Sequence, residues 1–532
     1  MDVAPIEGLQ TVFLILLVAI IVFALLARRL ATPYPIVLVI GGLLISLIPG
    51  TPRLMLNPQI FFFVVLPPLL YSAAWQTSWR EFQFNFISIF FLAFGLVTFT
   101  VFGVAKIAHW LLPGFSWQAG FVLGAVLSTT DAIAATSIAK RMGLPQRIVD
   151  VLEGESLVND ATGLLALEFG VAMVLENRAP SFTEAMVRLG VLVGGGVLVG
   201  LAVGFIVSRI ERRIDDAPIE ITLSLVVPYT AYIAAERLHA SGVLAVVVCG
   251  LYLSRRSALF FSPSVRIEAT AVWNAIDFVL NGIVFVLIGL QLHFVRDAIR
   301  GYSLKALIAY GALISVAVIV LRMIWVFPGG NVSFFIRNRF LGQHLGWPRM
   351  RGLFIVGWAG MRGVISLAAA LALPASFPQR NLILFLAFCV ILATLVLQGL
   401  SLPWLIRVLG VAVPRDDGEE LEARRLVLES ALQYLDELRE REGEHFGEVY
   451  DDLTQHYRAQ LGALRGEGGD EHGSGVEHDE MFRKLERDLM RVQRQTAVRL
   501  RDEGKIGDAV LRQIQRELDL GETRLMRLLP GA

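Results

Sequence analysis

The sequence predicts an all-α polytopic membrane protein with about thirteen transmembrane helices and a helical cytoplasmic tail. Three observations lead to this fold class. The 532 residues are 55% hydrophobic with a mean hydropathy of +0.62, which is too apolar for a soluble protein of this length. Many apolar runs approach the roughly 20 residues that span a bilayer. Charged residues gather in short loops and at the end of the chain. We therefore predict a transmembrane domain over 1–411 and a soluble tail over 412–532.

The apolar runs place the spans in order along the chain. They cover 9–27, 35–49, 58–75, 84–108, 117–140, 148–175, 184–208, 219–237, 239–254, 271–292, 303–327, 350–373 and 380–409. In the tail, 418–466 and 476–528 have the pattern of charged helices, joined by the acidic linker "GEGGDEHGSGVEHDE".

Positive charge predicts the orientation of these spans. The loops after the odd-numbered spans carry 16 Lys and Arg residues and the opposite loops carry nine. An excess of Lys and Arg marks the cytoplasmic side, so we expect the N-terminus outside and the tail in the cytoplasm. The chain starts with the acids Asp2 and Glu7 and has no basic region typical of a cleavable signal peptide. These features predict a multi-pass protein of the cell (inner) membrane.

Spans 1–6 and 8–13 have the arrangement of two copies of one unit, inserted in opposite directions around span 7. Folds of this kind place their site near the midplane, where discontinuous helices meet. The fifth member of each copy has an unusual centre: "GAVLSTTDAIAA" in span 5 and "GWAGMRGVIS" in span 12. Hydroxyl and carboxylate side chains in the first, and glycines in the second, favour a break. We predict that spans 5 and 12 are crossed, interrupted helices.

Span 7 contains Gly196, Gly200 and Gly204 at four-residue spacing. This spacing predicts close helix packing, and a contact between two copies of the chain is a second possible use.

Several charged residues lie deep inside the predicted spans. With a rise of about 1.5 Å per residue, Asp160 of span 6 lies about 18 Å from the cytoplasmic end, near the midplane. Asp131 of span 5 and Arg362 of span 12 reach a similar depth. Ionisable residues are rare within membranes and usually face the protein interior. They are therefore candidates for the functional site.

Spacing indicates what each polar group of span 6 can do. Ser156 and Asp160 are four residues apart and share one helix face, while Glu155 and Asn159 share the adjoining stripe. Arg322 of span 11 lies at the depth of Glu155, and an ion pair between them offsets the desolvation of both. That pairing leaves Asp160 as the carboxylate that is free to change its state.

These residues predict a mechanism of transport. Burial favours the neutral form of a carboxylate, so Asp160 can hold a proton or release it near neutral pH. When ionised, it can bind a monovalent cation together with Asp131, Ser156 and backbone carbonyls at the break. Because arginine stays charged, Arg322 supplies no second proton. We expect one proton to exchange for one cation without net charge movement.

At these residues the sequence resembles the sodium–proton exchanger branch of the monovalent cation–proton antiporters, and bacterial members most of all. The resemblance rests on "STTDAIAATSIAKRMGLP", "VLEGESLVNDATG", "FFFVVLPPLLYSAAW", "GIVFVLIGLQL", the Arg322 segment and "GWAGMRGVISLA", and it covers about residues 10–410. It implies thirteen helices, inverted repeats with crossed broken helices, and a homodimer.

The resemblance also implies a role for each site residue. Asp160 is implied to carry the proton or Na+ (Li+ being a further candidate), and Asn159 to complete the Asn-Asp pair of electroneutral members. Asp131, the Thr130 backbone and Ser156 are implied to complete the Na+ site. Glu155 is implied to pair with Arg322, and Arg362 to lie in the second crossed helix.

Two positions depart from the family pattern. Many relatives have proline after the aspartate of span 5, where this chain has Ala132. Many also have an acid at the position of Ser72, which is a weak candidate for the site. A second acidic ligand is therefore expected to be missing.

Other functions are alternatives to sodium/proton exchange. K+/H+ antiport is the main alternative, because the residues do not fix the size of the site. A cation channel needs a continuous pore, and an intramembrane aspartyl protease would use Asp131 and Asp160 as a dyad; the arginines and Asn159 suit ion coupling better. Nothing in the sequence indicates an enzyme, a cofactor or a nucleic-acid partner. Cys249 and Cys389 lie in apolar spans, without the pattern of a disulfide.

Overall fold

The computed structural model describes residues 4–30, 32–48, 57–175, 181–214, 216–260, 263–292, 295, 303–343, 349–412, 417–442 and 447–465, with isolated positions 493, 496, 499 and 503. The chain forms two compact units, residues 1–413 and 414–532. Each unit is described by itself below.

The membrane unit is built from helices only, as far as the chain is described, which confirms the predicted all-α class. The first part contains α1 (Ala4–Arg29), α2 (Tyr34–Ser46), α3 (Pro58–Ile60), the π-helical η1 (Phe61–Val65), α4 (Leu66–Gln76), α5 (Trp79–Phe90), the π-helical η2 (Phe91–Leu96), α6 (Val97–Leu111), α7 (Trp117–Ser128), α8 (Ala132–Arg141) and α9 (Gln146–Leu175). The second part contains α10 (Phe182–Glu211), α11 (Ala217–Arg237), α12 (Gly242–Phe260), α13 (Pro263–Leu290), α15 (Leu304–Phe340), α16 (Met350–Trp358), α17 (Val364–Leu371), α18 (Arg380–Ala393), the π-helical η3 (Thr394–Gln398) and α19 (Gly399–Leu409).

These helices have the length and surface expected in lipid. Nine helical stretches within the described ranges are long and apolar enough to cross a membrane, and Tyr34–Ser46 is a shorter apolar helix. Large apolar side chains point outward, such as Leu198 and Ile308, whereas charged residues such as Arg322 and Arg362 are buried. The chain is therefore a multi-pass membrane protein. Each of the thirteen predicted spans coincides with one helix or with consecutive helices, and the count of thirteen crossings stays a prediction.

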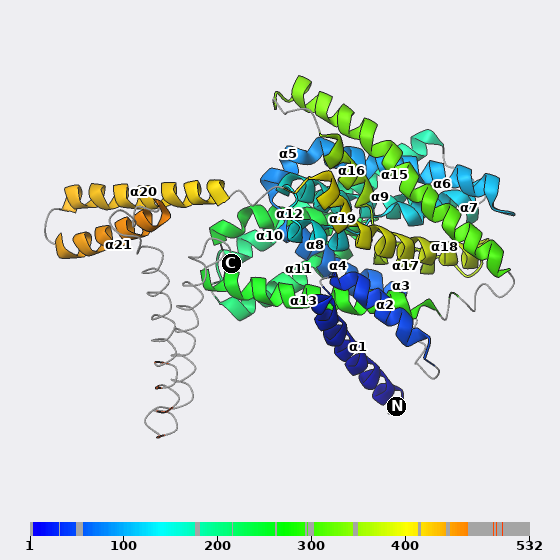
Figure 1. Cartoon of the computed structure of the whole chain (residues 1–532), viewed down its shortest axis with the longest axis horizontal. Coiled ribbons are helices and arrows are strands. Elements are labelled where there is room, and N and C mark those ends of the chain that lie inside the picture. Colours follow the sequence, from blue (N-terminus) through cyan, green and yellow to red (C-terminus); the bar gives the residue numbers. More distant parts are fainter. Residues whose placement is uncertain are drawn as a thin grey trace. The chain divides into compact units, whose positions relative to one another are not determined.

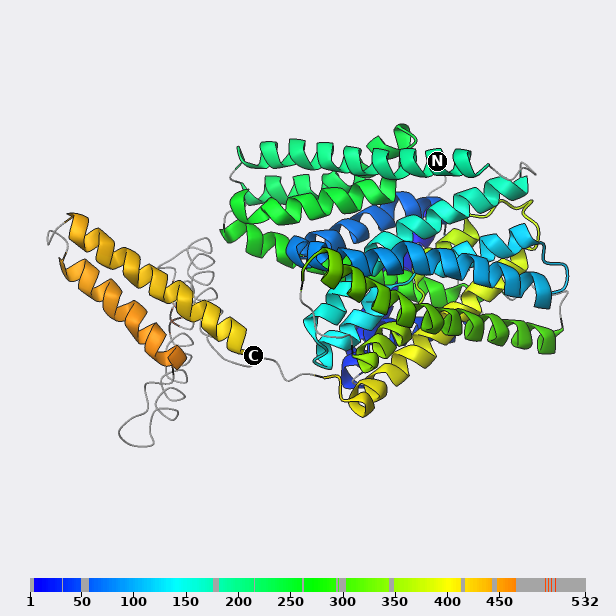
Figure 2. The ribbon, with the colours of Figure 1, turned by 90° about the horizontal axis from the view of Figure 1, so that it is seen from above.

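The helices of the membrane unit pack as two groups. One group contains α1, α2, α4 and α10 to α13, and the other contains α5 to α9 and α15 to α19. Figures 1 and 2 show α10 to α13 gathered on one side of the unit and α6, α7 and α15 to α18 on the other. The groups meet where α4 and α12 contact α9, where α2 contacts α8 and where α13 contacts α17. The interrupted helices therefore lie at the boundary between the groups.

Two consecutive prolines explain the π-helical turn before α4. Pro67 and Pro68 lack the N–H that would bond to the carbonyls four residues earlier. The carbonyl freed by Pro68 belongs to Val64, and the Tyr229 hydroxyl of α11 donates to it over 3.0 Å. This hydrogen bond thus ties the π-helical turn η1 to α11.

The glycines of span 7 lie in α10 and face α12, as Figure 2 shows for the two helices lying side by side. A Cβ atom on Gly200 would lie 2.5 Å from the Ala245 carbonyl oxygen, and one on Gly196 would lie 2.8 Å from that of Ser241. Close helix packing is confirmed, and the packing partner is α12 of the same chain rather than a second copy.

Helix α15 runs well beyond its predicted end at residue 327. Its 37 residues continue through Pro328 to Phe340, about 55 Å at the usual helical rise. The "FPGG" stretch suggests a stop, but Gly330 packs so closely on Leu353 of α16 that a Cβ would lie 2.6 Å from the leucine. Packing against α16 therefore stabilises a helix that local propensity does not favour.

The second unit contains α20 (Asp417–Glu442) and α21 (Gly447–Arg465), which pack side by side. Arg439 of α20 and Asp451 of α21 form an ion pair of 2.9 Å. The predicted helical segment 418–466 is thus a pair of helices. The segment predicted over 476–528 lies almost entirely outside the described residues.

Candidate functional site

Two interrupted helices cross in the interior of the membrane unit. The first is broken at residues 129–131, between α7 and α8, and the second at residues 359–363, between α16 and α17. At the crossing the backbone N–H of Asp131 donates to the Met361 carbonyl over 2.8 Å, and the Thr129 and Ser366 hydroxyls lie 2.8 Å apart. The predicted breaks and their crossing are confirmed.

Side chains rather than a proline hold the first break open. The Asp131 carboxylate accepts a hydrogen bond from the Ile133 N–H over 2.8 Å and so caps the start of α8. From α9, the Ser156 hydroxyl donates to the Thr130 carbonyl over 2.9 Å and accepts from the Ala132 N–H over 3.3 Å. Ala132 in place of proline therefore does not restore a continuous helix.

Arg322 of α15 joins three elements at the site. Its guanidinium forms a two-pronged ion pair with the Glu155 carboxylate of α9, in which Nη2 and Oε2 are 2.8 Å apart and Nη1 bonds to Oε1. It also donates to the last carbonyls of α16, at 3.0 Å from Val356 and 3.1 Å from Gly357. Both side chains of the pair are 1% exposed. The pair neutralises Glu155 and the negative end of a half-helix together.

Arg362 performs a similar task at the other break. Its Nε donates to the Leu127 carbonyl at the end of α7 over 3.0 Å, and its Nη1 donates to the Gly360 carbonyl. Its backbone N–H bonds to the Thr394 hydroxyl over 3.0 Å. Its Nη2 is buried and has no hydrogen-bond partner among the described residues. An arginine guanidinium thus faces the C-terminal, negative end of each of the two half-helices that stop at the crossing.

Asn159, the neighbour of Asp160 in the chain, bonds to the first break. Its Nδ2 donates to the Thr130 hydroxyl, which in turn donates to Glu155 over 3.1 Å. Its Oδ1 is buried and lacks a hydrogen-bond partner among the described residues. The Thr130 hydroxyl and the two α9 side chains therefore form one chain of hydrogen bonds beside Asp160.

The Asp160 carboxylate faces a cavity of about 440 Å³ between the two helix groups. Asp160 is 4% exposed, and no hydrogen bond among the described residues reaches its carboxylate. The cavity extends from the crossing to the Lys140–Glu153 ion pair, with oxygen-bearing residues on its wall. Those residues include Thr129, Thr130, Asp131, Ser156, Asp160, Asp277 and Asn281.

One acid of this cavity was missed in the sequence. Asp277 of α13 lines the wall contributed by the other helix group, and one of its oxygens, Oδ1, is buried without a hydrogen-bond partner in the described part of the chain. Ser72 donates to its other oxygen, and Gln76 donates to both Ser72 and Asp277, at 3.0 and 3.2 Å. The acid expected to be missing at Ser72 is thus replaced by Asp277. An aspartate inside the apolar run 271–292 was the signal that could have revealed it.

The structure brings most of the predicted site residues together. Thr130, Asp131, Ser156 and Asp160 line one cavity, Asn159 bonds to Thr130, and Glu155 pairs with Arg322. Arg362 lies at the crossing, and Ser72 does not line the cavity but bonds to Asp277 and Gln76, which do. Carboxylates, hydroxyls and carbonyls in this arrangement are the oxygen ligands that small hard cations prefer.

The comparison with known families decides the class of protein. The profile described as "Sodium/hydrogen exchanger, transmembrane" matches residues 13–408. The chain belongs to this family of sodium/hydrogen exchangers. It is therefore a cation–proton transporter and not an enzyme, as the sequence predicts.

Members of the exchanger family with similar sequences come from several bacteria. The chain is 35% identical over 532 residues to an uncharacterized Na+/H+ exchanger of Mycobacterium tuberculosis, covering 97% of this chain and 96% of that one. It is 34% identical over 450 residues to a sodium, potassium, lithium and rubidium/H+ antiporter of Bacillus pumilus, covering 81% and 65% of the two chains. It is 32% identical over 407 residues to the Na+/H+ antiporter ApNhaP of Aphanothece halophytica, covering 76% and 75%.

A solved structure shares the fold of this exchanger. The sodium proton antiporter MjNhaP1 of Methanocaldococcus jannaschii aligns with a TM-score of 0.60 over 76% of this chain and 99% of its own. The sequences are 19% identical, so this likeness concerns the fold alone.

Proposed function

We propose that the protein exchanges Na+ for H+ at a site centred on Asp160, which holds either ion but not both. One observation carries this proposal. The Glu155 carboxylate is already paired with Arg322. The Asp160 carboxylate, in contrast, is buried, faces the cavity and accepts no hydrogen bond among the described residues. A buried carboxylate without such partners is stabilised by binding a proton or a cation. Asp131, Thr130 and Ser156 are the proposed further ligands of Na+.

The charges around the crossing favour a one-to-one exchange. The Glu155–Arg322 pair has no net charge, which leaves Asp131, Asp160 and Arg362 at the crossing and Asp277 across the cavity. One proton or one monovalent cation bound at Asp160 changes the total charge of these groups by the same amount. The site therefore carries the same charge in both loaded states. We propose electroneutral transport.

The position of the cavity supports alternating access. Its walls come from both helix groups, α2, α4 and α13 on one side and α8, α9 and α17 on the other. A relative movement of the groups can close this cavity and open another on the far side of Asp160. With the tail in the cytoplasm, the present cavity opens inward. We further propose that the protein lies in the inner membrane and functions as a homodimer.

A preset pH gradient in vesicles tests the site directly. Adding Na+ should collapse the gradient with the wild-type protein and not with Asp160→Asn, whose amide cannot exchange a proton. Asp150→Asn is the matched control, because it makes the same change on the same helix away from the cavity. We expect it to transport at a nearly normal rate. Ordinary exchange by Asp160→Asn would refute the proposed site.

K+ is the second candidate cation, because the Bacillus pumilus relative is named for sodium, potassium, lithium and rubidium. The same assay with Li+ and K+ determines which cation the protein prefers.

A channel would pass the cation without a pH gradient and would generate a current. Electroneutral exchange predicts that turnover carries no current in proteoliposomes.

A further inference from the structure

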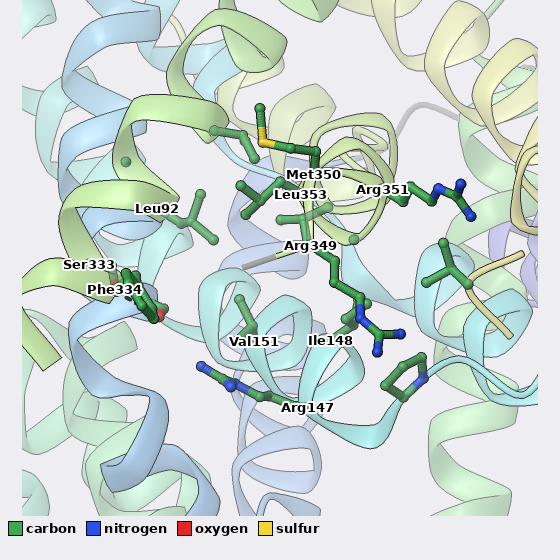
Figure 3. A pocket seen from close by; sticks show the side chains of 18 of the residues that line it. Leu92, Arg147, Ile148, Val151, Ser333, Phe334, Arg349, Met350, Arg351 and Leu353 are labelled. Atoms are coloured by element: carbon green, nitrogen blue, oxygen red, sulfur yellow. Dashed lines mark hydrogen bonds between the residues drawn. The ribbon is translucent and has the colours of Figure 1, made fainter. Parts of the chain in front are cut away.

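A second cavity, separate from the transport site, lies between α5, α9, α15 and α16. It has a volume of about 660 Å³ and is lined at its rim by Arg147, Arg349 and Arg351, with Arg337 deeper in the wall. In Figure 3 the Arg147 and Arg349 side chains lie close to Ile148 and Val151, while Arg351 points away from them. Arg351 donates to the Leu409 carbonyl over 3.1 Å. Three arginines are thus left for a ligand in the cavity.

Arg337 is the strongest indication of an anion-binding site. Its side chain is 1% exposed, yet its partners are neutral: Gln343 at 2.7 Å, Ser88 at 3.1 Å and Asn85 at 3.4 Å. Its Nη2 is buried and has no hydrogen-bond partner among the described residues. A buried guanidinium without a carboxylate is costly unless an anion compensates its charge.

The surroundings of Arg337 add positive charge instead of cancelling it. The guanidinium groups of Arg337 and Arg147 lie 4.7 and 5.8 Å from the centre of the same Phe84 ring. Glu81 acts electrostatically on Arg147 but does not line the cavity, and the described lining contains no acidic residue. Helix α16 also begins here, and no side chain caps its N-terminus. Guanidinium forks and uncapped N–H groups both favour a phosphate.

The rest of the cavity is apolar, and its outer helices face lipid. Leu92, Val326 and Leu353 are part of its wall, and Figure 3 shows Leu92 and Leu353 on the far side from Arg147. Ser88 and Ser333, whose hydroxyls are 2.8 Å apart, join α5 to α15 at this level. Next to them, exposed apolar side chains cover the outer surface: Phe86, Phe90, Val332 and Phe335. A ligand with an apolar part can therefore enter from the bilayer.

We propose that this cavity binds an anionic phospholipid, with the phosphate at Arg147, Arg337 and Arg349 and an acyl chain against the apolar wall. Basic pockets between transmembrane helices at the cytoplasmic surface are suited to such headgroups. The bound lipid would connect α9, which carries Asp160, to α15 and α16, which carry Arg322 and its carbonyl partners. The inference concerns a binding site apart from the transport site and does not depend on the proposed function.

Thermal unfolding of the purified full-length protein in a neutral detergent tests this site. Phosphatidylglycerol should raise the Tm of the wild type, whereas phosphatidylcholine and inorganic phosphate should not. In Arg147→Gln/Arg349→Gln, the phosphatidylglycerol concentration for half the shift should rise about tenfold or more, since two charges near the headgroup are lost. Arg339→Gln is the control, because Arg339 is exposed on α15 and does not line the cavity.

The possible results separate the ligands. An equal shift by inorganic phosphate would show a site for a soluble anion and overturn the lipid proposal, as would an unchanged response of the double variant. If the double variant does not fold, the site is tested on the wild-type protein by cross-linking with a photoreactive phosphatidylglycerol. Cross-links to the peptides containing Arg147 and Arg349 support the proposal, and cross-links confined to other helices overturn it.

Discussion

Three buried arginines in the described part of the chain differ in what balances their charge. Arg322 has the Glu155 carboxylate, Arg362 has backbone carbonyls, and Arg337 has neutral side chains. Each partner set assigns a role: the first removes a carboxylate from the ion site, the second stabilises a helix end, and the third is left open to an anion. The positions of the charges in the sequence do not distinguish these roles, but the contacts do.

The Glu155–Arg322 pair should behave as one structural unit. Glu155→Gln or Arg322→Gln alone leaves a buried charge without its partner and should cost about 3–5 kcal/mol of stability. The double variant should lose less than the sum of the two. Thermal unfolding in detergent measures these differences. The control is the partly exposed Lys140–Glu153 pair, whose removal should cost at most about 1 kcal/mol. Additive losses at Glu155 and Arg322 would contradict the pairing.

The residues of one helix were easier to predict than the contacts between helices. Ser156, Asn159 and Asp160 share α9, so helical spacing was enough to group them. Asp277 was missed because its partner Ser72 lies 205 residues away in the chain. A single aspartate in an apolar run gives no spacing from which to infer that contact.

At the scale of the helices, the site depends on two breaks that cross at very short range. A Cβ on Gly363 would overlap the Asp131 carboxylate, and the Gly363 backbone is otherwise an extended one with φ −131°. The glycine is therefore needed for space rather than for an unusual backbone angle. The glycine also keeps the start of α17 beside the capped start of α8.

Gly363→Ala should displace Asp131 and reduce the exchange rate by about tenfold or more, because small misplacements at a site have large effects. Gly194→Ala is the control, since a Cβ at Gly194 would meet nothing within 4 Å. Na+-driven collapse of a pH gradient measures both variants. An unimpaired Gly363→Ala protein would show that this close approach is not required.

The sequence predicted where helices break better than where they end. Polar residues at "STTD" and glycines at "GWAGMRG" act locally and were sufficient to place both breaks. The end of α15 was wrong by 13 residues, because packing of Gly330 on Leu353 outweighs the local effect of Pro328. The π-helical turns were not predicted, since they depend on which distant group, such as Tyr229, binds a freed carbonyl.

At the scale of the whole membrane unit, the transport cavity lies between two helix groups and reaches the Lys140–Glu153 ion pair. The two groups are discontinuous in the chain, because α5 to α9 separate α4 from α10. The distribution of Lys and Arg predicted which side of the membrane each loop faces. The division of the helices into two groups could not be predicted, because it depends on contacts between residues far apart in the chain.

Labelling from each side of the membrane tests this arrangement. In a chain whose Cys249 and Cys389 are replaced by alanine, Ser137→Cys in the cavity should react with an impermeant maleimide in inside-out vesicles. Leu238→Cys, 65% exposed between α11 and α12, should react in right-side-out vesicles. The reverse pattern would contradict the proposed orientation, and labelling of Ser137→Cys from both sides would contradict an occluded path.

The most direct test of the proposed ion site is whether protons and Na+ compete for Asp160. Transport rates in proteoliposomes should be measured against Na+ concentration over a range of pH on the side of Na+ entry. If one carboxylate holds either ion, the apparent KM for Na+ should rise in proportion to the proton concentration, about tenfold per pH unit in the acidic range, at a constant maximal rate. An apparent KM that does not change with pH, combined with a falling maximal rate, would contradict a shared site.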